Sequence, residues 1–158
     1  MRKRLVSPPS ELQNGPARDQ WLDLESTARV EVSSEDPASP IEAALLPTGA
    51  KGWRAAEPGR QTIRIVFDRA QHLRRIALVF EELRVERSQE FTLRWWPEGE
   101  QTPREIVRQQ WNFTPTGSVR EVEDYRVDLM EVAVLELEIV PDRSHGPAHA
   151  SLTEWRLA

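Results

Sequence analysis

The chain has 158 residues, of which 39% are hydrophobic and 30% are charged. These proportions are those of one folded globular domain rather than of a disordered chain, and no apolar run approaches the ~20 residues of a membrane-spanning helix. Cysteine is absent, which excludes disulfides, zinc–thiolate sites and a cysteine nucleophile. The net charge of −5 argues against general affinity for nucleic acid, because that affinity depends on neutralising phosphates.

The start of the chain differs in composition from the rest. Residues 1–20 are rich in Pro, Ser, Gln, Asn and Arg and have no sustained hydrophobic period. We expect them to form a flexible arm and residues 21–158 to form the folded domain. The basic residues 1–4 are followed by only two apolar residues before Ser7-Pro8-Pro9, so the apolar stretch of a signal peptide is missing. We therefore expect a cytoplasmic location.

From Arg29 onward, apolar and polar residues alternate with a period of two, which is typical of half-buried β-strands. In the clearest case, Ile63, Ile65 and Phe67 share one face of a strand. The strands predicted in this way are 29–33, 61–68, 73–80, 89–96, 105–113, 125–129, 135–139 and 151–157.

Helical pattern is scarce. Residues 40–46 are expected to form one helical turn, with Ser39 as its N-cap and Pro40 in its first position. Most other connections are short and contain turn residues, as at 97–99 and 115–117. Many short antiparallel strands without long helices predict an all-β sandwich or barrel of about eight strands.

Antiparallel strands reverse direction, so their connections should lie alternately at the two ends of a sandwich. We expect the longer connections to share one end, which we favour as the binding end because binding residues concentrate in long loops on a rigid scaffold. These connections are 34–60, 81–88, 114–119 and 141–150. The other end collects 69–72, 97–104 and 129–131.

The longer connections contain many arginine, histidine and aromatic side chains. Arginine and aromatic rings together suit sugars, and arginine also suits acidic groups. As the ligand-binding residues we predict Trp53, Arg54, Arg84, Arg87, Arg143 and His145. Arg60, Thr116 and His149 belong to the same end. The alternative is that these are solvated loop charges around a structural tryptophan.

Catalytic and metal sites have weaker support. Asp142, His145 and His149 suggest a metal, but Gly146 and Pro147 oppose the helix that would align the two histidines. No Gly-rich phosphate loop and no arrangement of Ser, His and an acid is visible. We therefore predict no enzymatic activity, no metal and no cofactor.

Acidic residues on the predicted strands could also suggest acid–base pairs. They are Glu121, Glu123, Asp124, Glu136 and Glu138. Because such residues alternate with apolar ones, we interpret them as a solvated strand face.

Six tryptophans is a high number for one domain. Trp95, Trp111 and Trp155 are expected in the core, whereas Trp53 is either a structural plug or a ligand platform. Arg94 and Trp96 should face outward together and are a candidate surface for a protein partner, since Trp and Arg are enriched at interaction hot spots. A single exposed aromatic without a role is the alternative.

The order of several segments resembles the galactose-binding-like superfamily, which includes coagulation-factor C-type (discoidin) domains and many carbohydrate-binding modules. The resemblance covers about residues 22–158 and rests on five segments: 28–34, 40–45, 52–53, 62–67 and 150–155. It implies a jelly-roll β-sandwich that recognises glycans, lipid head groups, proteins or, more rarely, DNA without catalysis. Within this superfamily, residues 53–56, Gly59 and 62–63 are also similar to the amino-terminal domain of the scaffold protein of DNA single-strand-break repair.

One feature departs from the superfamily pattern. Many members carry an acidic turn before the tryptophan and bind calcium there, but residues 46–53 contain no carboxylate. A hard cation needs several oxygen ligands, usually including carboxylates, so we expect no calcium. This difference also weakens the transfer of sugar binding from the superfamily.

Two functions remain open at this point. The first is binding of a glycan or similar polar ligand by the longer connections, with arginine side chains as donors above a floor shaped by Trp53. The second is an intracellular protein-interaction or scaffold domain that would contact its partner through Arg94 and Trp96, with a link to DNA repair as one form of this alternative. Neither the ligand, the partner nor the oligomeric state follows from the sequence.

Overall fold

The computed structural model describes residues 20–49 and 52–158. In chain order its elements are α2 (Leu24–Thr27), β1 (Ala28–Val32), α3 (Glu42–Leu45), β2 (Trp53–Pro58), β3 (Gln61–Glu81), β4 (Arg87–Pro97), β5 (Arg104–Phe113), β6 (Arg120–Val140), β7 (His149–Leu152) and β8 (Glu154–Leu157). All strand pairs are antiparallel, so the predicted all-β antiparallel class is confirmed. The predicted arm falls almost wholly on residues 1–19, which lie outside the described residues.

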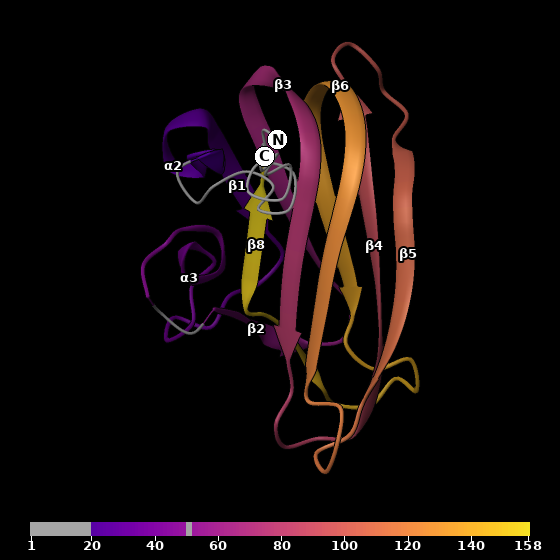
Figure 1. Ribbon diagram of the computed structural model, residues 1–158. Helices are drawn as coiled ribbons and strands as arrows, with labels where there is room; N and C mark the ends of the chain where they lie inside the picture. The colour runs from indigo at the N-terminus through magenta and orange to yellow at the C-terminus, as the bar shows by residue number, and fades with distance from the viewer. Residues whose placement is uncertain (1–19, 50–51) are drawn as a thin grey trace, which may run out of the picture.

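Two strands of 21 residues, β3 and β6, build both layers of the sandwich. Figure 1 shows each ribbon curling over at the top of the molecule and running back down. One layer joins β1, the first half of β3, the second half of β6, β4 and β5. The other joins the first half of β6, the second half of β3, and β8. The long strands therefore close the sandwich at one end.

The bends correct the predicted strand boundaries. Residues 69–72 and 129–131 are not connections between separate strands but lie inside β3 and β6, where the register shifts. Extra residues at such bulges bend the strand and locally disrupt its pairing, while the strand continues on either side. Glu131, in the bend of β6, has a left-handed backbone with φ of 56°. β2 and β7 form a further pair within predicted connections.

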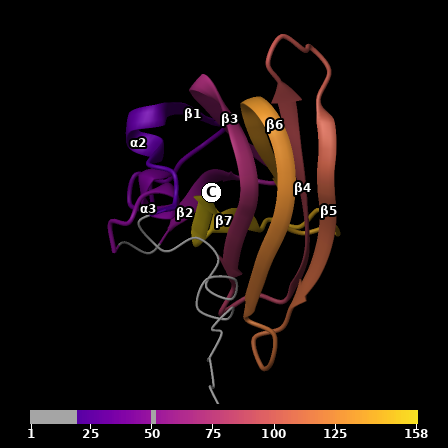
Figure 2. The same ribbon diagram turned by 45° about the horizontal axis from the view of Figure 1, so that its top comes forward.

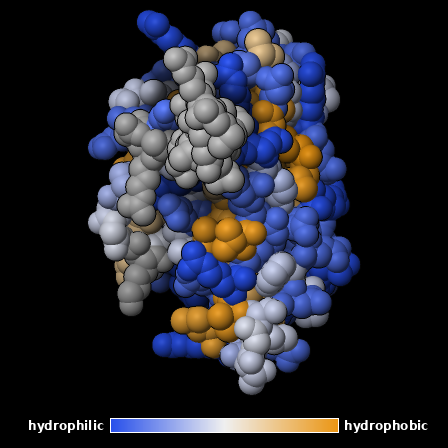
Figure 3. Space-filling model, viewed as in Figure 1, coloured by the Kyte–Doolittle hydropathy of each residue, from blue (hydrophilic) through white to orange (hydrophobic). Residues whose placement is uncertain are grey.

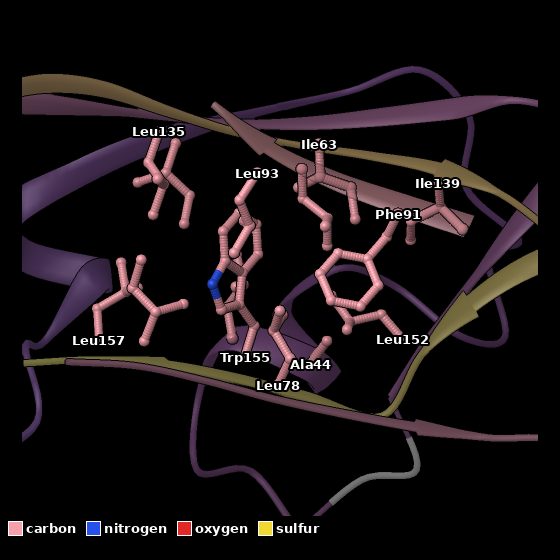
Figure 4. Packing of buried hydrophobic residues seen from close by; sticks show 14 of the residues in the cluster. Ala44, Ile63, Leu78, Phe91, Leu93, Leu135, Ile139, Leu152, Trp155 and Leu157 are labelled. Carbon is pink, nitrogen blue, oxygen red and sulfur yellow. The ribbon is translucent and has the colours of Figure 1, made fainter. Parts of the chain in front are cut away.

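The core lies between the two layers and follows the period-two pattern. Figure 4 shows Ile63, Leu93 and Leu135 pointing from one layer towards Trp155 and Leu157 on the other. Phe80 and Phe91 stack across the core with ring centroids 5.1 Å apart. Trp95 and Trp155 are buried as predicted. Trp111 is only half-buried, because it lies on the edge strand β5.

Both views show the two helices and β1 on the same side of the sandwich (Figures 1 and 2). The predicted helical turn is present as α3, but its N-cap residue is Ile41 and not Ser39. The backbone N–H of Ile41 donates to Glu35 Oε1 at 2.6 Å, so a distant carboxylate replaces the expected serine cap. No helix within the described ranges is long and apolar enough to cross a membrane.

Candidate functional site

Three of the four longer connections that were predicted to share one end of the sandwich lie together. Because β3 and β6 fold back, the segments 82–86, 114–119 and 141–148 meet at the lower end in Figure 1, which we call the loop end. The backbone N–H of Glu82 donates to the carbonyl of Val119 at 2.8 Å. At the opposite end, the N–H of Glu98 donates to the carbonyl of Glu131 at 2.8 Å.

Two neighbouring hollows lie at the loop end, with volumes of about 540 and 480 Å³. They share Arg54, Glu82 and Arg84 as lining residues, and we call them together the Arg54–Arg84 groove. The first hollow is further lined by Ser39, Gly52, Trp53, Glu81, Leu83, Ser151, Leu152 and Thr153, and the second by Val85, Asp142, Pro147, Ala148 and His149. Figure 3 shows an apolar patch bordered by hydrophilic residues near this end of the face in view.

The strand pair β2–β7 positions Arg54. Alternation along β2 buries Trp53 and Ala55 and turns Arg54 outward. The backbone of Arg54 is held at both polar groups, because its N–H donates to Ser39 O at 3.1 Å and its carbonyl accepts from Asp36 N–H at 2.9 Å. Its side chain is therefore carried by a rigid strand and not by a free loop.

Gly52 allows β2 to start close to β7. Its φ is 93°, and a Cβ atom there would lie 2.5 Å from the carbonyl oxygen of Leu152. Only glycine tolerates both the left-handed backbone and this close approach.

Trp53 follows Gly52 directly, is 1% exposed, and donates its indole N–H to Ser34 O at 3.1 Å. Its ring thus packs as a structural plug behind the groove and offers no open face to a ligand.

The connection between β3 and β4 carries the other shared residues. The N–H of Arg84 donates to Glu82 Oε2 at 3.2 Å. Burial opposes ionisation of Glu82, but the hydrogen bonds from Arg87 and from the Arg84 backbone outweigh it and hold the pKa of Glu82 below its usual value. Leu83 and Val85 alternate with these polar residues and are 63% and 49% exposed, so each hollow has one exposed apolar side chain in its wall.

The guanidinium groups of Arg54 and Arg84 have no hydrogen-bond or ion-pair partner among residues 20–49 and 52–158. His149 joins them in the second hollow. Its Nδ1 lies 3.0 Å from the carbonyl oxygen of Ala55, and since a carbonyl can only accept, Nδ1 carries the proton. Nε2 is left for other contacts. His149 belongs to the predicted loop end but was not among the predicted ligand residues.

Arg87 is not a free donor, contrary to the sequence prediction. Its side chain is fully buried. It donates to Glu82 Oε1 at 2.8 Å, to Gln89 Oε1 at 3.0 Å and to the carbonyl of Pro141 at 2.8 Å. The guanidinium also lies over the ring of Phe113, 4.8 Å from its centroid. Arg87 thus ties together the chain segments that form the loop end.

Arg143 and His145 lie outside the groove. Arg143 Nη1 donates to Gln110 Oε1 at 3.1 Å, and its Nε lies 3.5 Å from Glu90 Oε2. It lines a separate hollow of about 680 Å³ beside Phe113. His145 is exposed, with a left-handed backbone at φ of 62°. The structure therefore brings Trp53, Arg54 and Arg84 together and leaves these two apart.

A buried polar cluster of Arg87, Gln89 and Glu121 lies beneath the loop end. Glu121 is 0% exposed, and Gln89 Nε2 donates to its Oε1 at 3.3 Å. Within the described residues, Glu121 Oε2 and Arg87 Nη2 have no partner. Burial, followed by the negative charge of the nearby Glu123, raises the pKa of Glu121 to about 8.

The interpretation of the strand carboxylates as a solvated face is therefore wrong for Glu121 and also for Glu136. Glu121 has the same parity along β6 as Tyr125, Val127 and Leu129, which are partly buried. Glu136 faces outward but is buried, because Arg64 and Arg94 lie over it at 2.6 and 3.2 Å.

The same ion pairs occupy the predicted interaction surface. Arg94 Nη1 lies 3.2 Å from Glu136 and 3.5 Å from Glu138. Arg64 covers Trp96, 4.9 Å from the ring centroid, and Trp96 is half-buried. A protein contact through Arg94 and Trp96 stays a prediction, but both side chains already have partners within the chain.

No metal centre is visible among the described residues, where no group of three or more His, Cys, Asp or Glu side chains could hold an ion. The turn at 46–53 supplies no carboxylate. The residues present do not fit the calcium site that the superfamily resemblance implies.

No known family profile and no curated protein sequence matches this chain. Solved structures do. A pectin-binding carbohydrate-binding module is 14% identical, with a TM-score of 0.58 over 84% of this chain and 90% of the module. A module from a family 31 glycoside hydrolase of Clostridium perfringens is 16% identical, with a TM-score of 0.61 over 87% and 93%. The family 32 module of C. perfringens NanJ, solved with galactose, is 14% identical, with a TM-score of 0.59 over 87% and 96%.

The chain has the galactose-binding-like jelly-roll fold. The expected fold and the resemblance to these modules are thereby confirmed, over most of the chain and at low sequence identity. The likeness to the single-strand-break repair scaffold stays a prediction, as does the cytoplasmic location.

Proposed function

We propose that this chain is a non-catalytic binding module that recognises a carbohydrate, or a ligand of similar polarity, in the Arg54–Arg84 groove. The observation that carries the proposal is the pair of hollows sharing two arginines whose guanidinium groups have no partner in the described chain. Unpaired donors above a rigid scaffold suit a ligand with many acceptor oxygens.

The chemistry of the walls fits a sugar. Leu83 and Val85 offer apolar surface beside the arginines, and the C–H faces of a sugar ring bury against such surface while its hydroxyls accept hydrogen bonds. Structures with the same fold supply a second support, because one is a pectin-binding module and another was solved with galactose.

A glycan array followed by titration calorimetry tests this function. We expect the labelled protein to bind at least one glycan, and the double variant Arg54→Gln, Arg84→Gln to lose at least tenfold in affinity. Arg126→Gln is the control, because Arg126 is exposed on β6 and lines neither hollow. Unchanged affinity in the double variant would place the site elsewhere, and the absence of any glycan ligand would refute the function.

A further inference from the structure

We infer that the ligand of the Arg54–Arg84 groove is anionic, with a carboxylate or sulfate group held between the two arginines. This inference rests on the proposed function and names the class of carbohydrate. It starts from the charges that line the groove, which separate into groups that already have partners and groups that do not.

The carboxylates of the groove are all engaged. Glu81 Oε1 lies 3.1 Å from Arg120 Nη1, and Glu82 Oε1 accepts from Arg87 Nε at 2.8 Å. Asp142 Oδ1 accepts from the N–H and the hydroxyl of Ser144 at 3.1 and 2.8 Å. In the part of the chain that the structure describes, none of these carboxylates is hydrogen-bonded or ion-paired to the guanidinium group of Arg54 or Arg84.

Two guanidinium groups without a hydrogen-bond or ion-pair partner therefore lie in one concave site. Each guanidinium presents a planar set of N–H donors that matches the two oxygens of a carboxylate or sulfate, and such charged hydrogen bonds are about twice as strong as neutral ones. A neutral sugar would use these donors only partly. The chain as a whole carries −5, so the positive character is local to the groove and would not arise from a generally basic surface.

His149 adds a polar side chain to the wall of the groove. Because its Nδ1–H is directed to the carbonyl of Ala55, the imidazole is fixed in orientation on the wall of the second hollow. Arg54 and Arg84 belong to both hollows. An acidic group bound between these two arginines would place the neighbouring sugar units in the hollows on either side, next to Leu83 and Val85.

Matched pairs of probes test the inference: polygalacturonate against its fully methyl-esterified form, and 3′-sialyllactose against lactose. The first pair differs only in whether the carboxylates are esterified, so it isolates charge, whereas the second pair adds a whole acidic sugar residue to a neutral disaccharide. We expect an acidic member to bind at least tenfold more tightly than its neutral partner, with binding that weakens as salt is raised from 50 to about 300 mM, because exposed charges are screened.

The variants Arg54→Gln and Arg84→Gln should each reduce the acid-to-neutral ratio at least fivefold, and Arg84→Lys should keep part of it, because the charge remains while the planar fork is lost. Arg126→Gln should leave it unchanged. Equal or tighter binding of the neutral members, or a ratio unaffected by both Gln variants, would overturn the inference and leave the proposed function intact. Absence of binding to these probes and to every glycan of the array would overturn both.

Discussion

Two regions at the loop end contain arginine, and they differ in what surrounds the guanidinium. In the buried polar cluster, the side chain of Arg87 is inaccessible to solvent. It donates hydrogen bonds to Glu82 in the preceding connection, to Gln89 on its own strand and to the carbonyl of Pro141 after β6. Three residues away along the chain, Arg84 is exposed and its guanidinium has no partner in the described residues. Burial and partner geometry, and not residue type, therefore distinguish a structural arginine from one that is available to a ligand.

Substitution of Arg87 by Ala should have the largest effect on stability. It would leave Glu82, Gln89 and the carbonyl of Pro141 without their donor, and breaking a buried charged network in this way costs roughly 3–5 kcal/mol. Urea unfolding followed by tryptophan fluorescence measures the free energy of unfolding. Arg143→Ala is the control, expected to lose less than about 1 kcal/mol because its contacts are at the surface. Similar losses of unfolding free energy in Arg87→Ala and Arg143→Ala would contradict the distinction between a buried structural arginine and a surface one.

The buried carboxyl of Glu121 should make stability depend on pH. Its pKa of about 8 in the folded chain lies above the ~4.3 of an unfolded glutamate. Between these two values the folded state binds a proton that the unfolded state releases. The free energy of unfolding should therefore fall as pH rises from about 4.5 to about 8, by an amount on the order of a few kcal/mol.

Glu121→Gln isolates this contribution, because an amide resembles the protonated carboxyl and does not titrate. We expect the variant to gain stability relative to the wild type as pH rises from 5 to 8.5, measured by urea unfolding at each pH. Glu98→Gln, on an exposed turn, should follow the wild-type curve. Parallel curves for wild type and Glu121→Gln would show that Glu121 is ionised in the folded chain.

Gly52→Ala tests whether the wall of the groove depends on close packing. The new Cβ would meet the carbonyl of Leu152 at 2.5 Å, and steric strain of this kind together with the left-handed backbone costs about 2–4 kcal/mol. Gly59→Ala is a matched control: its φ is 83°, but nothing lies within 4 Å of the added Cβ, so about 1 kcal/mol is expected. Equal melting temperatures for the two variants would argue against the packing of β2 on β7.

Period-two alternation identified most of the strands, because inward residues such as Ile63, Leu93 and Trp155 must meet in one core. It failed at the bends of β3 and β6. Residues 68–72 are Asp-Arg-Ala-Gln-His and contain no glycine or proline. They therefore carry no sequence signal for a tight turn between two separate strands. Their lack of turn residues was the available sign that the strand continues through a bulge.

The site was less accessible to sequence reasoning than the fold. Loop length and residue type selected the end of the sandwich and, with other residues, Arg54 and Arg84 as candidates, and their role in binding stays a prediction. The engagement of Arg87 depends on Pro141, 54 residues away, and such a partner is fixed only when β4 and β6 pair. Glu121 could have been recognised, since it shares the inward parity of Tyr125 on β6.

Arg54→Gln and Arg84→Gln should change stability least. An exposed arginine without an ion-pair partner contributes little to folding, so each variant should stay within about 0.5 kcal/mol of the wild type. The measurement is urea unfolding under the conditions used for Arg87→Ala. This result matters for the binding experiments, because a loss of affinity in a fully stable variant can be attributed to the missing guanidinium. A loss above about 2 kcal/mol would instead make these residues structural, and the contrast with Arg87 would then disappear.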